Sequence, residues 1–191
     1  MFISNRFRYY HPLILLNNAP LKQCMSGKFL GVIVDDSLNF KLHIDYISNK
    51  VSKSIGILFK LKDYLPQSTL VSLYYSFIYP YLIYCNLVWG GTYSSHLGKL
   101  IKLQKKAIRV VNKVGYLEHT NQLFIDNSIL KLPEIHKLQL AKYMYTLDSH
   151  DNFYRSHEHD TRNRSNFIPQ FARLNLTQRS LCFMLPIISG S

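Results

Sequence analysis

The sequence has few cysteines, and that shortage narrows what the chain can be. Its 191 residues include three, Cys24, Cys85 and Cys182, which lie far apart and are odd in number. No disulfide framework and no Cys-x-x-Cys metal pair follows from this spacing, so a reducing intracellular compartment, nucleus or cytoplasm, is expected. The first residues contain no hydrophobic signal core bounded by small residues, so secretion is not expected.

Acidic residues are also scarce. The chain has 11 Asp and Glu against 23 Lys and Arg, a formal net charge of +12. That balance favours a polyanionic partner, nucleic acid first and an anionic membrane second. The charge is concentrated: residues 93–115 hold six basic groups and no acid, whereas residues 64–92 hold no Asp, Glu, Lys or Arg. Half of the net charge therefore lies in about one eighth of the chain, which is a patch and not a background.

Charged residues are few, at 18%, and 47% of the residues are hydrophobic, so a disordered chain is excluded for most of the length. Residues 70–89 are uncharged and mostly apolar, which is a transmembrane length. The run contains five tyrosines and a central proline, Pro80, whereas lipid-facing helices keep their tyrosines at the ends. A buried core helix is the preferred interpretation, and a membrane segment remains the alternative.

Hydrophobic periodicity divides the first eighty residues into elements. Short apolar runs predict strands over 13–16 and 28–34, the second mostly buried. Spacings of three and four predict a helix over 41–62, with Asn39 as its cap and an interior Gly56 that close packing would explain. A second helix is predicted over 67–79, beginning near Pro66 and broken at Pro80.

The segment 95–114 predicts the most informative helix. Ser94 or Ser95 is expected to cap it, and Leu100, Leu103, Ala107, Val110 and Val114 form its apolar stripe. The basic residues follow a parallel row: Lys99, Lys102, Lys106, Arg109 and Lys113, with Lys105 nearby. Adjacent like charges destabilise a helix, and no acid within the segment offsets them. Contact with nucleic acid is favoured over a merely solvated basic face, and both interpretations stay open.

Beyond this helix, two further helices are predicted over 118–129 and 133–147. The second should place Ile135, Leu138, Ala141 and Tyr145 on its buried face. From residue 149 onward the periodicity is lost, and a polar tract follows that includes His150, His157 and His159. The expectation for residues 149–191 is a polar loop and a poorly ordered tail.

Candidate chemical sites are weak. Asp35 and Asp36 follow a strand, as the metal-binding carboxylates of a polymerase do, but no upstream strand supplies a third carboxylate, and a strand-ending turn is preferred. His157 and His159 with His150 offer only a faint metal pattern, and Cys85 is expected to be an apolar filler. We therefore predict no catalytic residue, no metal site and no cofactor bound by this chain.

A set of segments spread over the chain forms a distinctive pattern: Lys28 to Asp35 (KFLGVIVD), Leu38 to Ile44 (LNFKLHI), Ile57 to Leu61, Tyr64 to Pro66, Leu73 to Leu82, Tyr84, Trp89-Gly90, Leu103 to Arg109 and His159 to Arg162. In these segments the chain resembles the reverse transcriptases of non-LTR retrotransposons of the jockey-like and CR1-like kind. The segments occur in the family's order, with fitting gaps, over nearly the whole chain. The end of the chain, Phe183-Met184-Leu185-Pro186, departs from the family's pattern.

The resemblance implies a mainly α fold: a short N-terminal β-hairpin, a thumb-like helical bundle and a poorly ordered tail. It implies that residues 1–39 are a remnant of the palm with its primer-grip hairpin, 40–115 the thumb-like bundle, 116–148 additional helices and 149–191 the loop and tail. Phe29, Leu30 and Gly31 would be the primer-grip-like residues.

The same resemblance implies a function for the chain. It would be a truncated RNA-directed DNA polymerase fragment whose catalytic carboxylates, and the Mg²⁺ they hold, belong to the full-length enzyme. A template–primer duplex of RNA or DNA would be its partner, held by Lys99, Lys102, Lys105, Lys106, Arg109 and Lys113. Self-association through unpaired strands is expected. The alternatives are a stand-alone RNA- or DNA-binding helical module and a membrane-associated protein.

Overall fold

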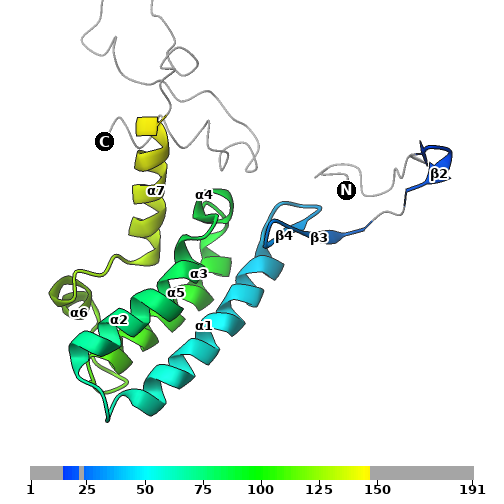
Figure 1. Ribbon diagram of the computed structural model, residues 1–191. Coiled ribbons are helices and arrows are strands. Elements are labelled where there is room, and N and C mark those ends of the chain that lie inside the picture. The colour runs from blue at the N-terminus through cyan, green and yellow to red at the C-terminus, as the bar shows by residue number, and fades with distance from the viewer. Residues whose placement is uncertain (1–14, 22–23, 147–191) are drawn as a thin grey trace, which may run out of the picture.

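The computed structural model describes residues 15–21 and 24–146. Within these ranges it contains four short strands and seven helices. The strands are β1 (Leu15–Leu16), β2 (Ala19–Pro20), β3 (Ser26–Phe29) and β4 (Val32–Asp35). The helices are α1 (Lys41–Leu61), α2 (Gln67–Phe77), α3 (Tyr79–Ile83), α4 (Asn86–Trp89), α5 (Ser94–Val111), α6 (Asn121–Asp126) and α7 (Leu132–Thr146). The mainly α fold with a short hairpin before the bundle is confirmed (Figure 1).

The strand predicted over 28–34 is wrong as a single buried element, because the chain reverses in its middle. β3 pairs antiparallel with β4, and Phe29 lies opposite Val32 across a two-residue turn. Leu30 and Gly31 both have positive φ, 44° and 84°, as a type I′ turn requires. Val32 and Val34 of β4 pack with the core of the bundle, whereas β3 is largely exposed. The prediction over 13–16 is confirmed at Leu15–Leu16, which pair with Ala19–Pro20, and residues 13 and 14 lie outside the described residues.

Helix α1 is close to its prediction. The positions Ile44, Ile47, Val51, Ile55 and Leu58 are all buried, as their spacing requires. Asn39 accepts the backbone N–H of Lys41 at 2.9 Å, although the residue next to the helix is Phe40, with φ 55°. Gly56 does not have the close neighbour that was expected, because a Cβ added there would meet nothing within 4 Å.

The apolar run 70–89 folds as short helices and not as one long span. α2 ends at Phe77, and Pro80 occupies the first turn of α3, where its missing N–H is tolerated. α4 follows after Cys85, which has φ 49°. In the part of the chain that is described, no helix combines the length and apolar composition needed to cross a membrane.

The last three helices depart from prediction at their ends. α5 begins at Ser94 with Tyr93 as its N-cap, and no side chain caps it, so the expected Ser94 or Ser95 cap is wrong. α6 is shorter than predicted. On α7 the expected face is wrong beyond its middle: Ile135 and Leu140 are buried, whereas Ala141 and Tyr145 are exposed. α7 contacts α3 and α4, and its buried positions end at Leu140, so no described side chain beyond that residue is buried.

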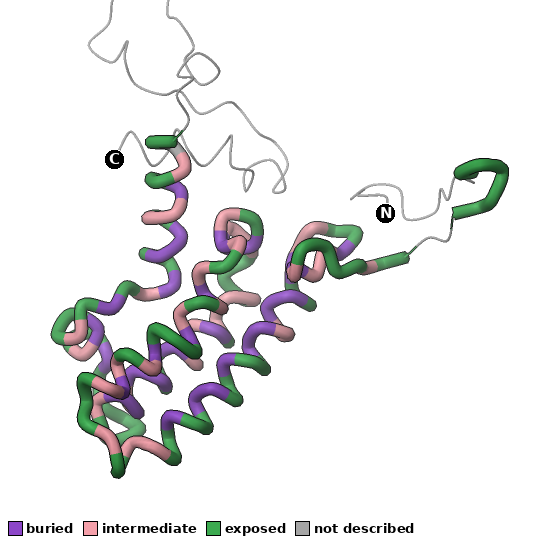
Figure 2. Tube along the Cα trace, viewed as in Figure 1, coloured by how far each residue is buried: buried purple, intermediate pink, exposed green. Residues whose placement is uncertain are grey.

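The core lies between α1, α2, α3 and α5, with α4 and α7 covering one end. Buried positions alternate with exposed ones along α1 and α5, whose long axes lie side by side (Figures 1 and 2). Trp89, Tyr74 and Leu58 are among the largest fully buried side chains. The predictions for the polar tract, for His150, His157 and His159, for Cys182 and for residues 149–191 lie outside the described residues.

Candidate nucleic-acid interface

A groove of about 730 Å³ runs between α1 and α5. Small side chains on both helices leave it open: Ser48 and Ser52 line it from α1, and Ser95 and Gly98 from α5. A glycine inside a helix costs about 1 kcal/mol relative to alanine. Nothing lies within 4 Å of a Cβ added at Gly98, so the structure gives no packing reason for that residue other than the open groove.

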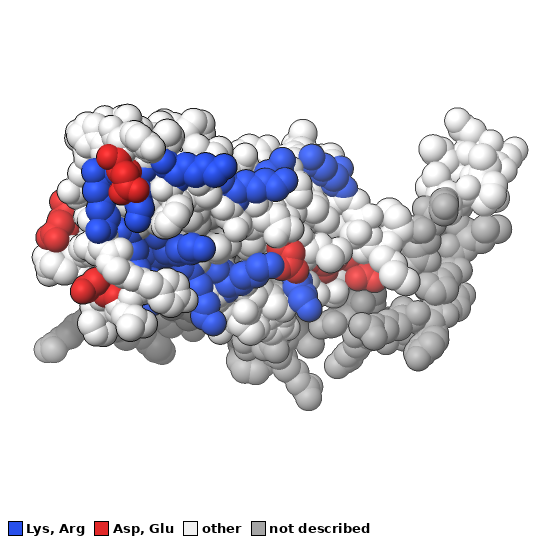
Figure 3. Space-filling model, turned by 90° about the horizontal axis from the view of Figure 1, so that it is seen from below, with Lys and Arg blue, Asp and Glu red and all other residues white. Residues whose placement is uncertain are grey.

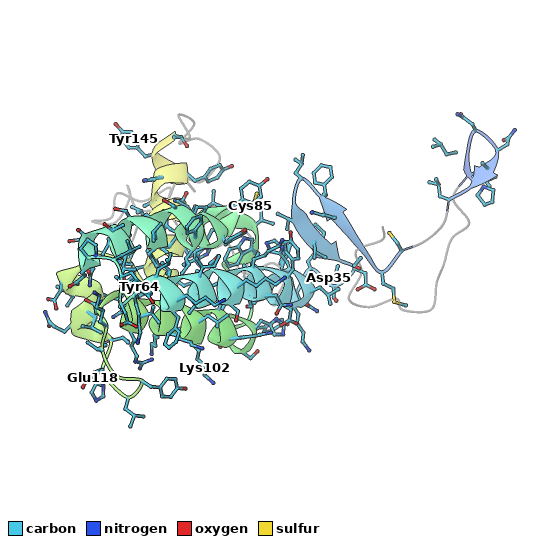
Figure 4. All side chains as sticks on the ribbon, turned by 60° about the horizontal axis from the view of Figure 1, so that its bottom comes forward. Asp35, Tyr64, Cys85, Lys102, Glu118 and Tyr145 are labelled. Atoms are coloured by element: carbon cyan, nitrogen blue, oxygen red, sulfur yellow. The ribbon has the colours of Figure 1, made fainter. Side chains whose placement is uncertain are left out.

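Cations from α5 line the groove along most of its length. They are Lys99, Lys102, Lys105, Lys106 and Arg109. At 100° per residue these five positions fall within an arc of about 120°, and Lys99 and Arg109 are separated by about 15 Å along the axis. Figure 3 shows Lys and Arg side chains spread over this face with few acidic ones between them, and in Figure 4 Lys102 points away from the bundle. The helix therefore presents a continuous positive edge.

An acid from outside the segment pairs with the first lysine of this row. Asp45 of α1 reaches across the groove and forms an ion pair with Lys99 at 2.8 Å. The count of charges within residues 93–115 did not include this acid, because Asp45 belongs to another helix. Among the described residues, the other ion pair within 4 Å is Lys131 with Glu134, so Lys102, Lys105 and Lys106 form none there. These three exposed lysines keep their charge available to an external anion.

Arg109 and Lys113 differ from the predicted row in their surroundings. Arg109 donates from Nε to the backbone carbonyl of Glu118 at 2.9 Å, and its guanidinium lies 5.7 Å from the Tyr116 ring centre. It therefore positions the loop after α5 as well as lining the groove. The helix ends at Val111, so Lys113 follows it in a left-handed conformation with φ 55°. Lys113 is exposed, but it is not part of the helical row.

Sequence reasoning missed three polar contributors to the site. Ser48, Asn49 and Tyr116 also line the groove. The Oγ of Ser48 is buried and has no hydrogen-bond partner among the described residues. The available signal was the pair Ser48 and Ser52, two small polar residues one helical turn apart on the same helix.

The predicted primer-grip-like residues lie together at the tip of the β3–β4 hairpin. Phe29 and Leu30 are exposed, at 69% and 73% of their surface, which is unusual for large apolar side chains. Tyr84 supports the tip from below: its hydroxyl donates to the Leu30 carbonyl at 2.6 Å, and its ring would lie 3.3 Å from a Cβ at Gly31. The structure thus holds an apolar tip in a fixed position, and its role remains a prediction.

Asp35 has a local structural role. Its carboxylate accepts the backbone N–H groups of Ser37, Asn39 and Phe40, the last at 2.8 Å, and so ties β4 to the start of α1. This agrees with the strand-ending turn preferred from the sequence. Within the described ranges no three His, Cys, Asp or Glu side chains gather where they could hold a metal ion.

Two buried histidines brace the bundle near the hairpin end. The backbone N–H of Ile33 donates to His43 Nδ1 at 3.3 Å, and His43 packs edge-on against Trp89. His136 on α7 lies 2.9 Å from the Asn86 side-chain oxygen on α4. Burial lowers the pKa of both imidazoles, so both are neutral at pH 7. Gly90 packs directly against the His136 ring.

Together these features define a small helical bundle with a hairpin at one end and a positively charged groove between its two longest helices. Over 144 to 146 residues, 74% of its length, the chain is similar to RNA-directed DNA polymerases of insect mobile elements. The jockey polymerases of Drosophila funebris and Drosophila melanogaster are 28% and 30% identical to it. A probable polymerase of the Drosophila melanogaster X-element transposon is 25% identical.

The chain is therefore related to a region of non-LTR retrotransposon reverse transcriptases, as the sequence resemblance predicted. It spans about one sixth of the length of the curated relatives it matches, 16% in each case. No family model matches the chain, and no solved structure matches it.

Proposed function

We propose that this region grips the template–primer duplex of a reverse transcriptase through the groove between α1 and α5. The single observation that carries the proposal is the row of exposed cations on one face of α5, three of which form no ion pair among the described residues. A nucleic-acid backbone carries a regular series of negative phosphates, and a row of cations can contact several of them in succession. Lysine contacts to phosphate bind the backbone without reading the base sequence. The likeness to RNA-directed DNA polymerases supports that kind of partner.

In this proposal the chain binds and positions and does not itself add nucleotides. The carboxylate of Asp35, which belongs to the one Asp-Asp pair of the sequence, accepts three backbone N–H groups and so supports the hairpin junction. The Mg²⁺-holding carboxylates would belong to the full-length polymerase. Binding of the template–primer duplex would take place in the nucleus or the cytoplasm.

A stand-alone nucleic-acid-binding module is the second candidate, because the groove is complete within residues 48–116. Comparing a primed template with an unprimed single strand distinguishes the two candidates. A duplex grip should prefer the primed template, whereas a general binding module should hold both about equally.

The test compares affinities at fixed salt for a primed RNA template. The variant changes Lys102, Lys105 and Lys106 together to Gln. These three lysines are exposed and lie outside the buried apolar stripe of α5. The matched control changes Lys131, Lys137 and Lys142 to Gln; these lie at or on α7, do not line the groove, and lower the net charge equally. The groove variant should bind at least about tenfold more weakly at 0.1 M salt, and the control should bind almost as the wild type. Equal weakening in both variants would contradict the groove proposal.

A further inference from the structure

A second pocket, of about 270 Å³, lies where the hairpin meets the bundle. Its walls come from three elements: Lys28 of β3, His43 and Tyr46 of α1, and Tyr81 and Tyr84 at α3. Gly31 in the hairpin turn also borders it. Small-molecule pockets in proteins begin at about 300 Å³, so this one suits a single heterocyclic base whose attached groups extend beyond the pocket.

The pocket is separate from the basic groove. His43, Tyr46 and Ile47 line it from α1, whereas Ser48, Asn49 and Ser52 line the groove. At 100° per residue these two sets lie on opposite sides of the helix. A ligand in one therefore leaves the other open, and the two sites can be tested independently.

Three tyrosine rings and Lys28 line the pocket, and Lys50, which does not line it, lies near the Tyr46 ring. Lys28 Nζ and Lys50 Nζ lie 5.5 Å and 5.7 Å from the centre of the Tyr46 ring. Neither lysine forms an ion pair within 4 Å among the described residues. An aromatic wall beside two cations is the combination that holds a nucleotide, with the base against the rings and the phosphate at the ammonium groups.

His43 adds a directional donor to this wall. Its Nδ1 accepts the Ile33 N–H, so the proton of the neutral ring must be on Nε2. The ring packs edge-on against Trp89 and stacks near Tyr46, with centroid distances of 5.8 Å and 6.4 Å. A fixed N–H in an aromatic pocket can donate to a ring nitrogen or carbonyl of a base.

From these contacts we infer that the hairpin–bundle pocket binds a single unstacked nucleotide, with the base between Tyr46 and Tyr81 and the phosphate at Lys28 and Lys50. The nucleotide comes either free or as an unpaired residue of a bound strand. The inference does not depend on the proposed duplex grip, because it uses none of the groove residues.

The experiment uses the full chain and the fluorescent nucleotide 2-aminopurine riboside 5′-monophosphate, whose emission is quenched when the base stacks on an aromatic ring. The wild type should show saturable quenching. Tyr81→Leu and Lys28→Gln should each weaken it by about fivefold or more, the first because a stacked ring is lost. The controls are Tyr64→Leu and Lys60→Gln, exposed residues that do not line the pocket and should change affinity less than about twofold.

Three further binding measurements show which site holds the nucleotide and whether that nucleotide is free or part of a strand. The groove variant of Lys102, Lys105 and Lys106 should quench as the wild type does, even if it has lost duplex binding. The same base placed unpaired in a short oligonucleotide should be quenched, and the same base within a duplex should not. If the free nucleotide binds no better than the oligonucleotide base, the strand is the source; if only the free form binds, the nucleotide is a small-molecule ligand.

The inference is overturned if the wild type shows no saturable quenching. It is also overturned if Tyr64→Leu weakens binding as much as Tyr81→Leu does. Lys28→Gln keeps the test decisive should Tyr81→Leu unfold, because Lys28 is exposed on β3 and its removal leaves the buried core intact. Folding of each variant is checked by thermal unfolding before binding is compared.

Discussion

The amide of Gln104 on α5 donates to the hydroxyl of Tyr74 on α2 at 3.0 Å, in the middle of the apolar core. The same amide nitrogen also donates to the Leu130 carbonyl, and the amide oxygen accepts the Leu132 N–H, both at 2.9 Å. One buried side chain therefore joins two core helices to the segment that begins α7. It fixes α5, and with it the basic row on its outer face.

The first prediction follows from this network. Gln104→Leu should lower the free energy of unfolding by about 2–4 kcal/mol, because it leaves the buried Leu132 N–H without its partner and removes the bonds to Tyr74 and to the half-buried Leu130 carbonyl. Tyr74→Phe should cost less, about 1 kcal/mol, because Gln104 keeps its backbone partners. Urea unfolding of both variants measures the difference. A Gln104→Leu protein as stable as Tyr74→Phe would show that the network does not hold α5.

Two glycines should respond oppositely to alanine. A Cβ at Gly56 meets nothing within 4 Å, so Gly56→Ala should stabilise the protein by about 0.5–1 kcal/mol. At Gly90 a Cβ would overlap the His136 ring and lie 2.5 Å from the Asn86 carbonyl oxygen, so Gly90→Ala should destabilise by about 1–3 kcal/mol. Paired melting curves test both. Melting temperatures that move in the same direction would disprove the packing described here.

Stability should fall as the pH drops below about 6.5. His43 and His136 have lowered pKa values in the folded state, so the unfolded chain binds more protons in the range below 6.5, and acid favours unfolding. His136 donates from Nδ1 to Asn86, and its buried Nε2 has no partner among the described residues, so a second proton there would be uncompensated.

The pH prediction is measured by urea unfolding between about pH 7.5 and 5. His136→Gln should flatten the dependence, whereas His119→Gln, at an exposed position, should leave it as in the wild type. A wild-type protein whose stability does not change over this range would contradict the account of both histidines.

The chain alone should not incorporate nucleotides on a primed RNA template with magnesium. Asp35 is engaged by backbone N–H groups, and we place the metal-holding carboxylates in the full-length polymerase. The measurement is template-dependent incorporation by the purified protein. Incorporation that disappears when Asp35 and Asp36 are both changed to Asn would refute this part of the proposal.

The sequence was most informative where a periodic pattern was long. The apolar positions of α1, and the break at Pro80, follow from spacing and from proline geometry. The sequence was misleading where a tertiary contact determines the conformation of the chain. The turn at Leu30 and Gly31 divides an apolar run that looked like one strand, and Tyr84, distant in sequence, supports that turn.

The candidate site shows the same limit. The cations of α5 could be read from sequence, because they share one helix. Neither Asp45, which neutralises one of them, nor the serines that open the groove could be assigned, because α1 is placed against α5 only by folding. On α7 the apolar positions continue past Leu140, the last buried residue of the helix among the described side chains, so the sequence predicts a longer buried face than the structure has there.

The measurement that tests the central claim most directly is the salt dependence of duplex binding. For one B-DNA duplex, the logarithm of the binding constant should fall with the logarithm of salt concentration, with a slope of about −0.9 for each phosphate neutralised. Changing Lys102, Lys105 and Lys106 to Gln should reduce the steepness by about 2 to 3, and the matched changes at Lys131, Lys137 and Lys142 should leave it unchanged. The same slope in the wild type and the groove variant would mean that these lysines are only a solvated face, and that the groove does not hold nucleic acid.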